Sequence, residues 1–514
     1  MFHNVLFIVA IDKRETFTTS PSMPDGVGAG RHVLPHGAFR RGSEPFLMSD
    51  ADFPSLSIAK EKSMSTERQE SKLKRNLTFW DLMGIAVGQI IGAGIMSSTG
   101  VAIGMTGTGV VLAYAISPIL TLICIFPVAV MSAAVPATGG QYRYVSRLLG
   151  KNMGTYYLIV YTLMNCLLAM YSLSFATYVV SMFTGLSVQW VAISVLTFFY
   201  LTNLIGTKTA AILNKAITAC LIAGLLLFVA FGTPKVDLAY VFDPNNLFKN
   251  GLGSFIGTLA LLSSATAGAQ FIVELGGESK DAGRNIPRVI VISTIAVGVL
   301  YVLIALVAAG VLPMEQVVDQ PLSLVADVIM PKTFYYLFVI GAALGATAST
   351  INSQMSWVTK PMLVACEDGL LPKSMATVSK NGVPWKWLTF FYIVGMLPLV
   401  TGFDLATVAK FSTANSLVSK IFICLALTQL ARKYPVQLAN STLKFSQTAC
   451  YALSIVSVIV LMILSGSLLM NLSVYAIGFL VVAAIGTVIY NATVCKDLVI
   501  PDDLAVDYTT GNQE

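Results

Sequence analysis

Charged residues are scarce in this chain. Only 11% of its 514 residues are Asp, Glu, Lys or Arg, whereas an ordinary soluble domain carries about a quarter. Hydrophobic residues make up 55% of the sequence, and the mean hydropathy is +0.76. Most of this surface cannot face water, so the composition excludes an ordinary soluble globular protein and indicates an integral membrane protein.

Histidine and paired cysteine are also missing from the apolar part of the sequence. His3, His32 and His36 all lie in the polar N-terminal region, which argues against imidazole or metal chemistry inside a membrane. The seven cysteines are scattered without paired spacing, so they indicate neither a disulfide framework nor a zinc site. The net charge is +6, but the basic residues do not cluster into a continuous basic surface, so we expect no nucleic-acid partner.

The first 75 residues are polar and rich in Ser, Pro and Gly, which is typical of a disordered tail. The apolar stretch Val5–Ile11 is too short to span a membrane and lacks a preceding basic region, so it makes a poor signal peptide. The segment that begins at Met64 looks like the ordinary N-terminus of a membrane protein of this kind. Residues 1–63 are therefore a candidate upstream extension that the cell does not make, which N-terminal mass determination decides.

From Trp80 onward, apolar segments close to the ~20 residues needed to cross a bilayer follow one another at short intervals. We predict about twelve membrane-spanning helices in an all-α integral membrane protein. The expected spans are 80–103, 109–134, 154–183, 187–206, 209–232, 252–276, 288–312, 333–362, 386–402, 405–430, 448–470 and 472–495.

Lysine and arginine are concentrated in alternate loops between these segments. Clusters precede the first segment and follow the second, sixth, eighth and tenth, whereas the opposite loops hold few cations among acids such as Asp237 and Glu315. Because cationic loops resist translocation, the pattern places both termini in the cytoplasm. We expect a multi-pass protein of the plasma (inner) membrane, surrounded by lipid, and the oligomeric state stays open.

Two expected spans are interrupted by small residues at membrane depth. The first contains the run Gly88–Ile95, and the sixth contains the run Ser263–Gln270. These spans are five apart, which is the offset that an inverted repeat of five helices requires. Because unpaired backbone groups at this depth must line a cavity or be buried in protein, the runs predict unwound helices beside a binding site.

A helix break of this kind suits a small zwitterion without any charged side chain. The free N–H groups that begin the second half-helix can hold a carboxylate, and the carbonyls that end the first half-helix can hold an ammonium group. The alternative is close helix packing, since Gly84, Gly88 and Gly92 fall at four-residue spacing. The matching offset of the two runs favours a binding site.

Four sequence motifs follow one another between residues 76 and 430. They are the glycine-rich run Gly88–Ile95, the Pro-x-x-Gly-Gly-x-Tyr segment Pro136–Tyr144, the acidic Arg-x-Ile-Pro loop Glu278–Pro287 and the Asp-Gly-x-x-Pro loop Glu367–Pro372. In this order and spacing they resemble the motifs of the amino acid-polyamine-organocation transporters. The four together are more specific than any one of them.

The resemblance implies a LeuT-type fold, in which two inverted five-helix repeats, here 76–232 and 233–434, precede two additional helices, here 435–496. Cytoplasmic tails would occupy 1–75 and 497–514. It also implies that Gly92, Ala93 and Gly94 bind a substrate carboxylate, and that carbonyls at Ile90 or Ile91 and in 263–265 bind the amine. The full expected site comprises Ile90, Ile91, Gly92, Ala93, Gly94, Ile95, Ser263, Ser264, Ala265, Thr266 and Gly268.

The sequence departs from the family pattern at two places. Ser264 and Thr266 stand where many relatives have aromatic residues, one of which closes over the substrate, so that gate is absent or comes from elsewhere, with Tyr161 and Tyr171 as candidates. Leu221 stands in place of a fifth-helix lysine found in proton-coupled members and some exchangers. The coupling ion, H⁺ or Na⁺, therefore stays open, as does uncoupled exchange, and no cofactor is expected.

Hydroxyl groups crowd the expected eighth span. Thr347, Ser349, Thr350 and Ser353 could hold a sodium ion together with carbonyls of the first span, which makes Thr350 and Ser353 candidates for ion coupling. The alternative is that these hydroxyls bond carbonyls of the preceding helical turn.

Ionisable residues within the expected spans are functional candidates, because burial of a charge in lipid is costly. Glu274 is a candidate cytoplasmic gate carboxylate or proton acceptor, and the alternative is a plain salt bridge. For Lys215 and Lys360 we expect side chains that extend to the cytoplasmic surface. Asn165, Asn352 and Asn415 could hydrogen-bond substrate or neighbouring helices, and we expect the latter.

The sequence thus predicts a secondary active transporter that carries amino acids across the membrane by alternating access. Nothing in the spans suggests covalent chemistry, so we do not expect an enzyme. One alternative is a carrier or exchanger for a small amine or polyamine, which usually needs an acidic residue of a kind not seen at the breaks. Another is a membrane-embedded sensor, which should carry a soluble signalling domain.

Overall fold

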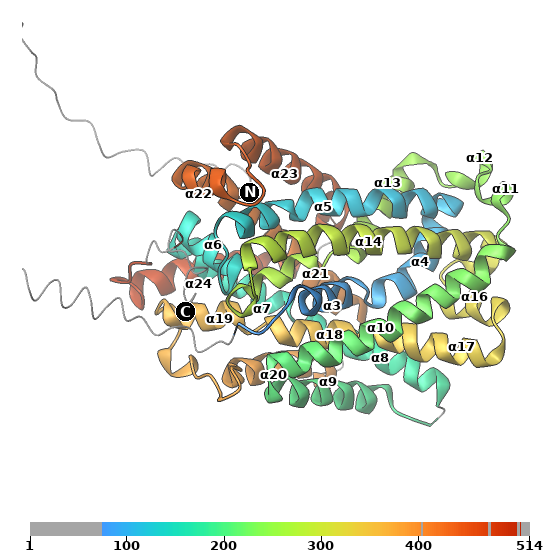
Figure 1. Ribbon diagram of the computed structural model, residues 1–514, viewed down its shortest axis with the longest axis horizontal. Helices are drawn as coiled ribbons and strands as arrows, with labels where there is room; N and C mark the ends of the chain where they lie inside the picture. The colour runs from blue at the N-terminus through green and yellow to red at the C-terminus, as the bar shows by residue number, and fades with distance from the viewer. Residues whose placement is uncertain (1–74, 184, 402–404, 471–473, 501–503, 505–514) are drawn as a thin grey trace, which may run out of the picture. The chain divides into compact units, whose positions relative to one another are not determined.

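The computed structural model describes residues 75–183, 185–401, 405–470, 474–500 and 504 (Figure 1). The predicted tails therefore lie almost entirely outside the described residues. Within these ranges the chain is helical, and its only β-type pairing consists of two isolated bridges, Leu77 with Ser279 and Thr138 with Leu275. The prediction of an all-α protein is confirmed.

Helices cover every segment that the sequence predicts to span the membrane. They are α3 Phe79–Ile90, α4 Ala93–Thr106, α5 Val110–Ala134, α7 Lys151–Met164, α8 Leu167–Met182, α9 Val188–Ile205, α10 Thr207–Gly232, α13 Gly251–Ala265, α14 Ala282–Gly310, α17 Lys332–Phe338, α18 Gly345–Trp357, α19 Lys360–Glu367, α20 Trp385–Thr401, α21 Leu405–Lys433, α23 Gln447–Met470 and α24 Val474–Thr493. A π-helical turn, Val339–Leu344, joins α17 to α18. Eight of the described helical stretches are long and apolar enough to cross a membrane, and several shorter apolar helices accompany them.

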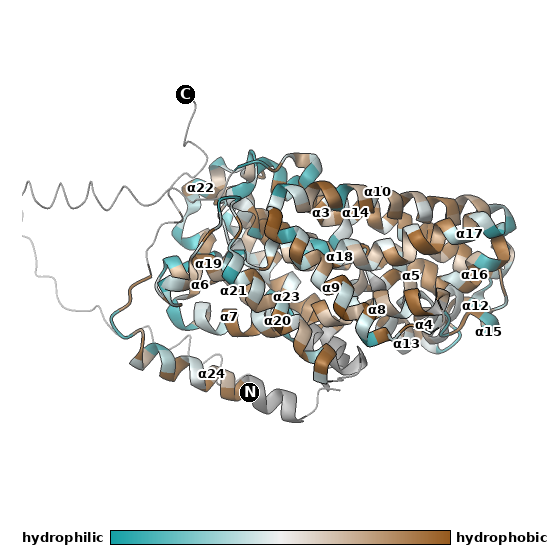
Figure 2. Cartoon of the chain, turned by 90° about the horizontal axis from the view of Figure 1, so that it is seen from below, coloured by the Kyte–Doolittle hydropathy of each residue, from teal (hydrophilic) through white to brown (hydrophobic). Residues whose placement is uncertain are grey.

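Short elements lie at the two ends of the helical bundle (Figure 1). At one end, here called the α6 end, lie α6 Gly140–Leu149 and α19, and the chain enters α3 from this side. At the other, the α16 end, lie α11 Leu238–Val241, α12 Pro244–Leu247, α15 Met314–Val317 and α16 Leu322–Ile329 (Figures 1 and 2). Figure 2 shows hydrophobic residues along the long helices and hydrophilic residues gathered at these ends, as a membrane-spanning bundle requires.

The outer faces of the long helices carry large apolar side chains. On α14, Ile292, Ile295 and Val299 are all exposed and follow one another at helical spacing. In water such a stripe would be unfavourable, whereas in a bilayer it faces lipid tails at no cost. Together with the apolar composition, these faces identify an integral membrane protein.

Helix α18 lies in the interior, and every one of its residues is buried. It packs against α3, α8, α9 and α10. The Asn352 side-chain amide donates to the carbonyl of Ala210 at 2.8 Å and accepts a hydrogen bond from Asn203, and Asn165 accepts one from Gln354 at 2.7 Å. Asn165 and Asn352 thus bond neighbouring helices, as predicted.

Candidate substrate and ion site

The first predicted span is broken within the predicted run. Helix α3 ends at Ile90, Ile91 has φ −81° and ψ 86°, Gly92 is extended, and α4 begins at Ala93. No side chain caps the start of α4. Its first amides, from Ala93 to Ile95, therefore lack intrahelical acceptors and lie at the positive end of a 14-residue helix, where an anion is stabilised.

The sixth span is broken at the corresponding place. Helix α13 ends at Ala265, and Gly268 has a φ of +144°, which strongly favours glycine. The chain then continues as a 3-10 helix, η4 Ala269–Glu274, and a second 3-10 turn, η5 Gly276–Glu278. The apolar run alone predicts an ordinary α-helix here, so the 3-10 form of this half of the span was not foreseen.

The two breaks face each other across a close backbone contact. A Cβ atom added to Gly94 would lie 3.0 Å from the Cβ of Ala265, and one added to Gly268 would lie 2.9 Å from the carbonyl oxygen of Gln89. Close packing, the alternative interpretation of the glycines, also applies, because a Cβ on Gly88 would lie 2.7 Å from the side-chain amide of Asn214. The glycines therefore serve both purposes.

The predicted site residues differ in their solvent exposure. Ile90, Ile91, Gly92, Ile95, Ser263, Thr266 and Gly268 are buried, Gly94 and Ala265 are half-buried, and Ser264 is exposed. The carbonyl of Ile90 already accepts from Gly92 and from the hydroxyl of Tyr301, and that of Ser263 accepts from Thr121 at 2.9 Å. Ile91 and Ala265 therefore offer the freer carbonyls at the ends of the two first half-helices.

A group of oxygen atoms converges beside the first break. The Thr350 hydroxyl lies 2.9 Å from the carbonyl oxygens of Gly88 and Ala346 and 3.4 Å from that of Ile91. The Ser349 hydroxyl lies 3.2 Å from the oxygen of Gly88 and 3.0 Å from that of Ala346. These three carbonyls and two hydroxyls, here called the oxygen cluster, are the hard oxygen donors that a small cation prefers.

The other two predicted hydroxyls lie outside the oxygen cluster. Ser353 donates to the carbonyl of Ile85 at 3.1 Å, one turn earlier on α3. Thr347 bonds only carbonyls of its own preceding turn, at Ala343 and Leu344. For Thr347, therefore, the alternative stated above is correct, namely that the hydroxyl bonds carbonyls of its own helix.

A layer of aromatic rings closes the breaks toward the α6 end. Phe271 on η4 stacks on Trp357 of α18 with ring centroids 4.3 Å apart and planes within 4°, and the Trp357 indole donates to the side chain of Gln89 at 3.2 Å. Tyr161 packs edge-on against Trp357, and its hydroxyl donates to the carbonyl of Val358. Sequence reasoning named Tyr161 but missed Phe271 and Trp357. Phe271 follows the glycine of its span, whereas the family pattern has its aromatics before it.

Buried ion pairs lie beyond this layer. Lys360 pairs with Glu278, both less than 6% exposed, and Arg147 pairs with Asp368, with Nη2 to Oδ1 at 2.5 Å. The prediction that Lys360 extends to the surface is wrong, because η5 places Glu278 beneath α19 and supplies a buried partner. Lys215 is 40% exposed and pairs with the buried carboxylate of Asp81 at 2.7 Å, a residue that sequence reasoning overlooked.

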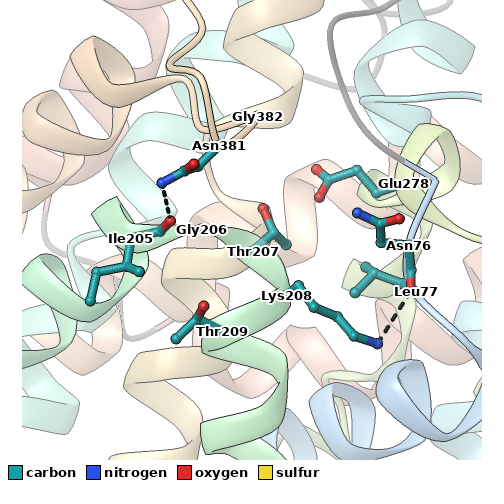
Figure 3. A pocket seen from close by; sticks show the side chains of 10 residues that line it. All are labelled: Asn76, Leu77, Ile205, Gly206, Thr207, Lys208, Thr209, Glu278, Asn381 and Gly382. Atoms are coloured by element: carbon teal, nitrogen blue, oxygen red, sulfur yellow. Dashed lines mark hydrogen bonds between the residues drawn. The ribbon is translucent and has the colours of Figure 1, made fainter.

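Backbone pairing links the segments before α3 and α6 to the second break. The Leu77 amide donates to the carbonyl of Glu278, the Lys280 amide donates to that of Leu77, both at 2.9 Å, and the Gly139 amide donates to that of Glu274 at 3.1 Å. We call these three hydrogen bonds the latch. Beside it lies a cavity of about 190 Å³ lined by Asn76, Thr207, Lys208, Glu278 and Asn381, among others (Figure 3).

Loss of one partner of the Lys360 and Glu278 pair should destabilise the protein strongly. Lys360→Ala leaves a buried carboxylate without its cation, which costs about 3–5 kcal/mol of unfolding free energy. The matched control is Lys249→Ala, which removes an exposed pair with Glu315 worth about 1 kcal/mol or less. Thermal unfolding in detergent should show a much larger loss for Lys360→Ala. Equal, small losses would contradict the burial of this pair.

An all-helical bundle with apolar faces, membrane-length helices and two facing helix breaks defines an integral membrane protein of the transporter class. Among the described residues, no group of three or more His, Cys, Asp and Glu side chains could hold a metal ion. Residues 77–493 match the family model described as "Amino acid permease". The chain belongs to this family and is a permease rather than an enzyme.

Individual relatives agree with this assignment. The chain is 27% identical to the branched-chain amino acid permease BcaP of Bacillus subtilis (strain 168), over 71% of this chain and 83% of that protein. It is 26% identical to the amino-acid permease RocE of the same organism, over 71% and 82%. It is also 26% identical to the D-serine/D-alanine/glycine transporter of Escherichia coli (strain K12), over 62% and 71%. The predicted family and transporter class are confirmed.

Proposed function

We propose that the protein is a secondary active transporter that binds an amino acid between the two helix breaks and moves it by alternating access. The pair of facing breaks carries this proposal. The uncapped amides of Ala93, Gly94 and Ile95 would hold the carboxylate, and the carbonyls of Ile91 and Ala265 would hold the ammonium group. No charged side chain is needed for either end.

The proposed architecture is the LeuT-type arrangement of twelve spans, with inverted repeats 76–232 and 233–434 and additional helices in 435–496. Its support is the offset between the broken spans, α3 with α4 and α13 with η4, which occupy equivalent places in the two repeats. The α6 end would be cytoplasmic, because the elements there carry Arg143, Arg147 and Lys280. With that orientation both termini would be cytoplasmic, and we propose the plasma membrane as the location.

The described conformation would be the one closed toward the cytoplasm. The Phe271 and Trp357 stack, the Glu278 and Lys360 pair and the latch all lie between the breaks and the α6 end. On the opposite side of the breaks, Ser264 is exposed and Gly94 is half-buried. Release of the substrate to the cytoplasm would require these three closures to separate.

We propose sodium as the coupling ion, held by the oxygen cluster. Its five oxygens, from Gly88, Ile91, Ala346, Ser349 and Thr350, combine carbonyls of the first break with hydroxyls of α18. A bound cation would therefore stabilise the broken form of α3 against which the substrate binds. Ion and substrate would favour each other's binding through this shared backbone.

A binding screen and a flux assay together test the proposed function. In detergent, an amino acid should raise the melting temperature, whereas its methyl ester and its decarboxylated amine should not, because neither presents a carboxylate to the α4 amides. In proteoliposomes, the stabilising amino acid should exchange across the membrane. An amine or polyamine that stabilises as well as the amino acid would favour the alternative carrier, and absence of exchange for every stabilising ligand would favour a sensor.

A further inference from the structure

Glu274, the last residue of η4, is a buried carboxyl group that the proposed transport mechanism leaves unused. It is fully buried, and neither carboxyl oxygen has a hydrogen-bond partner among the described residues. The buried cations nearby are already paired, Lys360 with Glu278 and Arg147 with Asp368. A carboxylate without a cation or a hydrogen-bond donor is much less stable in such surroundings than the neutral acid.

The groups that face Glu274 do not compensate a charge. The backbone and side-chain amides of Gln141, in the first turn of α6, face the carboxyl, yet the Gln141 side-chain nitrogen also lacks a partner. The hydroxyls of Tyr144, Tyr157 and Tyr161 lie close enough to be influenced by Glu274. Tyr144 and Tyr161 donate to the carbonyls of Val135 and Val358, and the Tyr157 hydroxyl, a neutral group, has no hydrogen-bond partner among the described residues. Neither carboxyl oxygen accepts a hydrogen bond from a described cation, and Arg143 of α6 is itself engaged in an interaction.

The remaining elements packed on η4 also bring no free charge to Glu274. These are α3, α5, α14, α18 and η5. Of their titratable groups, Asp81 is bonded to Lys208 and Lys215, Tyr114 to Thr99, Tyr301 to Ile90 and Glu278 to Lys360, and Arg284 and Arg288 of α14 are exposed.

Glu274 lies at a joint that must move if the α6 end opens. Its own carbonyl accepts the latch hydrogen bond from Gly139, and the next residue, Leu275, forms the bridge with Thr138. The same short segment connects the second break to Glu278. Separation of α6 from η4 would therefore break this hydrogen bond and admit water to the Glu274 carboxyl in one step.

We propose that Glu274 is a proton-binding site that links opening of the cytoplasmic side to proton release. In the closed state the carboxyl holds its proton. When the latch opens, the O–H bond breaks, the proton passes to cytoplasmic water, and the hydrated carboxylate remains. Closing takes a proton back from the cytoplasm. This inference rests on the proposed alternating access, and it assigns the proton to a cytoplasmic step, separate from the sodium at the oxygen cluster.

The linkage has a defined sign. Since the closed state binds one more proton than the open state, a rise in cytoplasmic pH favours opening, and a fall favours closure. One linked proton changes the opening equilibrium by about tenfold per pH unit in the range where the two states differ in protonation. An alkaline cytoplasm should therefore delay the return of the transporter to its outward-facing state.

Hydrogen exchange of the latch amides tests the proposal without requiring transport. The amides are those of Leu77, Gly139 and Lys280, followed by mass spectrometry of the full chain between pH 6 and pH 9, with the intrinsic chemical pH dependence subtracted. We expect the wild-type latch to open about tenfold more per pH unit over part of this range. Glu274→Gln, which is isosteric with the neutral acid, should keep the latch protected and independent of pH. Glu274→Asp should restore the pH dependence.

The matched control is Glu315→Gln, which removes an exposed carboxylate at the α16 end and should behave as wild type. Retention of the wild-type pH dependence in Glu274→Gln, at an unchanged melting temperature, would overturn the proposal. If Glu274→Gln does not fold, Glu274→Met supplies an uncharged alternative and the same comparison applies. Exchange of labelled for unlabelled amino acid across the membrane separates the proton-binding role of Glu274 from the proposed transport function. If Glu274→Gln exchanges amino acid but its latch shows no pH dependence, both proposals are supported. If the wild type does not exchange amino acid, only the proposed transport function is refuted.

Discussion

Gly268→Ala should reduce amino acid transport by about 100-fold or more. Gly268 has a φ of +144°, which costs about 1–3 kcal/mol for a residue with a side chain. The added Cβ would also lie 2.9 Å from the backbone oxygen of Gln89, which has no side-chain freedom with which to move away. The two helix breaks would be pushed apart at the place where the substrate is proposed to bind. Initial uptake rates in proteoliposomes measure the effect.

Gly251→Ala is the matched control for this experiment. Gly251 also has a positive φ, of +80°, but nothing lies within 4 Å of the position of an added Cβ. The substitution carries backbone strain without the overlap, so transport should fall by less than about tenfold. Equal losses in the two variants would show that strain alone matters, and that close contact between the breaks is not required.

Thr350→Val should weaken the activation of transport by sodium. The substitution keeps the shape of the side chain but deletes the hydroxyl that lies within 2.9 Å of the Gly88 and Ala346 carbonyls. Loss of one ligand from the oxygen cluster should raise the sodium concentration for half-maximal uptake by about 10-fold to 100-fold. Uptake measured across a sodium series, with potassium or choline replacing sodium, reports this shift.

Thr347→Val provides the control within the same helix. Its hydroxyl donates to the carbonyls of Ala343 and Leu344 in the preceding turn, and the described residues show no hydrogen bond from it to α3. Its sodium dependence should match that of the wild type. An unchanged sodium response in Thr350→Val, or a wild type that transports equally in choline, would exclude sodium from the oxygen cluster and leave proton coupling or exchange.

Local sequence signals predicted the helix breaks, because glycine weakens a helix wherever it occurs. Gly92 and Gly268 both lie in irregular backbone within the runs that the sequence marks. The spacing of Thr350 and Ser353, three positions apart on one helix, likewise predicts two hydroxyls on a common face, and both meet α3. These features depend on neighbours three or four residues away, and a single sequence contains that information.

Features that depend on distant partners escaped prediction. Lys360 is a lysine near the end of a span, and only the fold shows that η5 brings Glu278 to it. Phe271 and Trp357 are 86 positions apart, and nothing in either segment indicates that the rings stack. Sequence reasoning proposed a salt bridge as one alternative for Glu274, yet the structure gives it no ionic partner among the described residues. Tertiary packing decided each of these outcomes.

A structure of the protein with a bound amino acid would show whether the substrate lies between the two helix breaks. The protein should be prepared with the amino acid that gives the largest thermal stabilisation, in sodium. We predict that the carboxylate oxygens lie within hydrogen-bond distance of the amides of Ala93 to Ile95, with the ammonium group at the carbonyls of Ile91 and Ala265. An amino acid bound elsewhere, for example in the cavity between Asn76, Thr207 and Glu278, with the breaks unoccupied, would contradict the account.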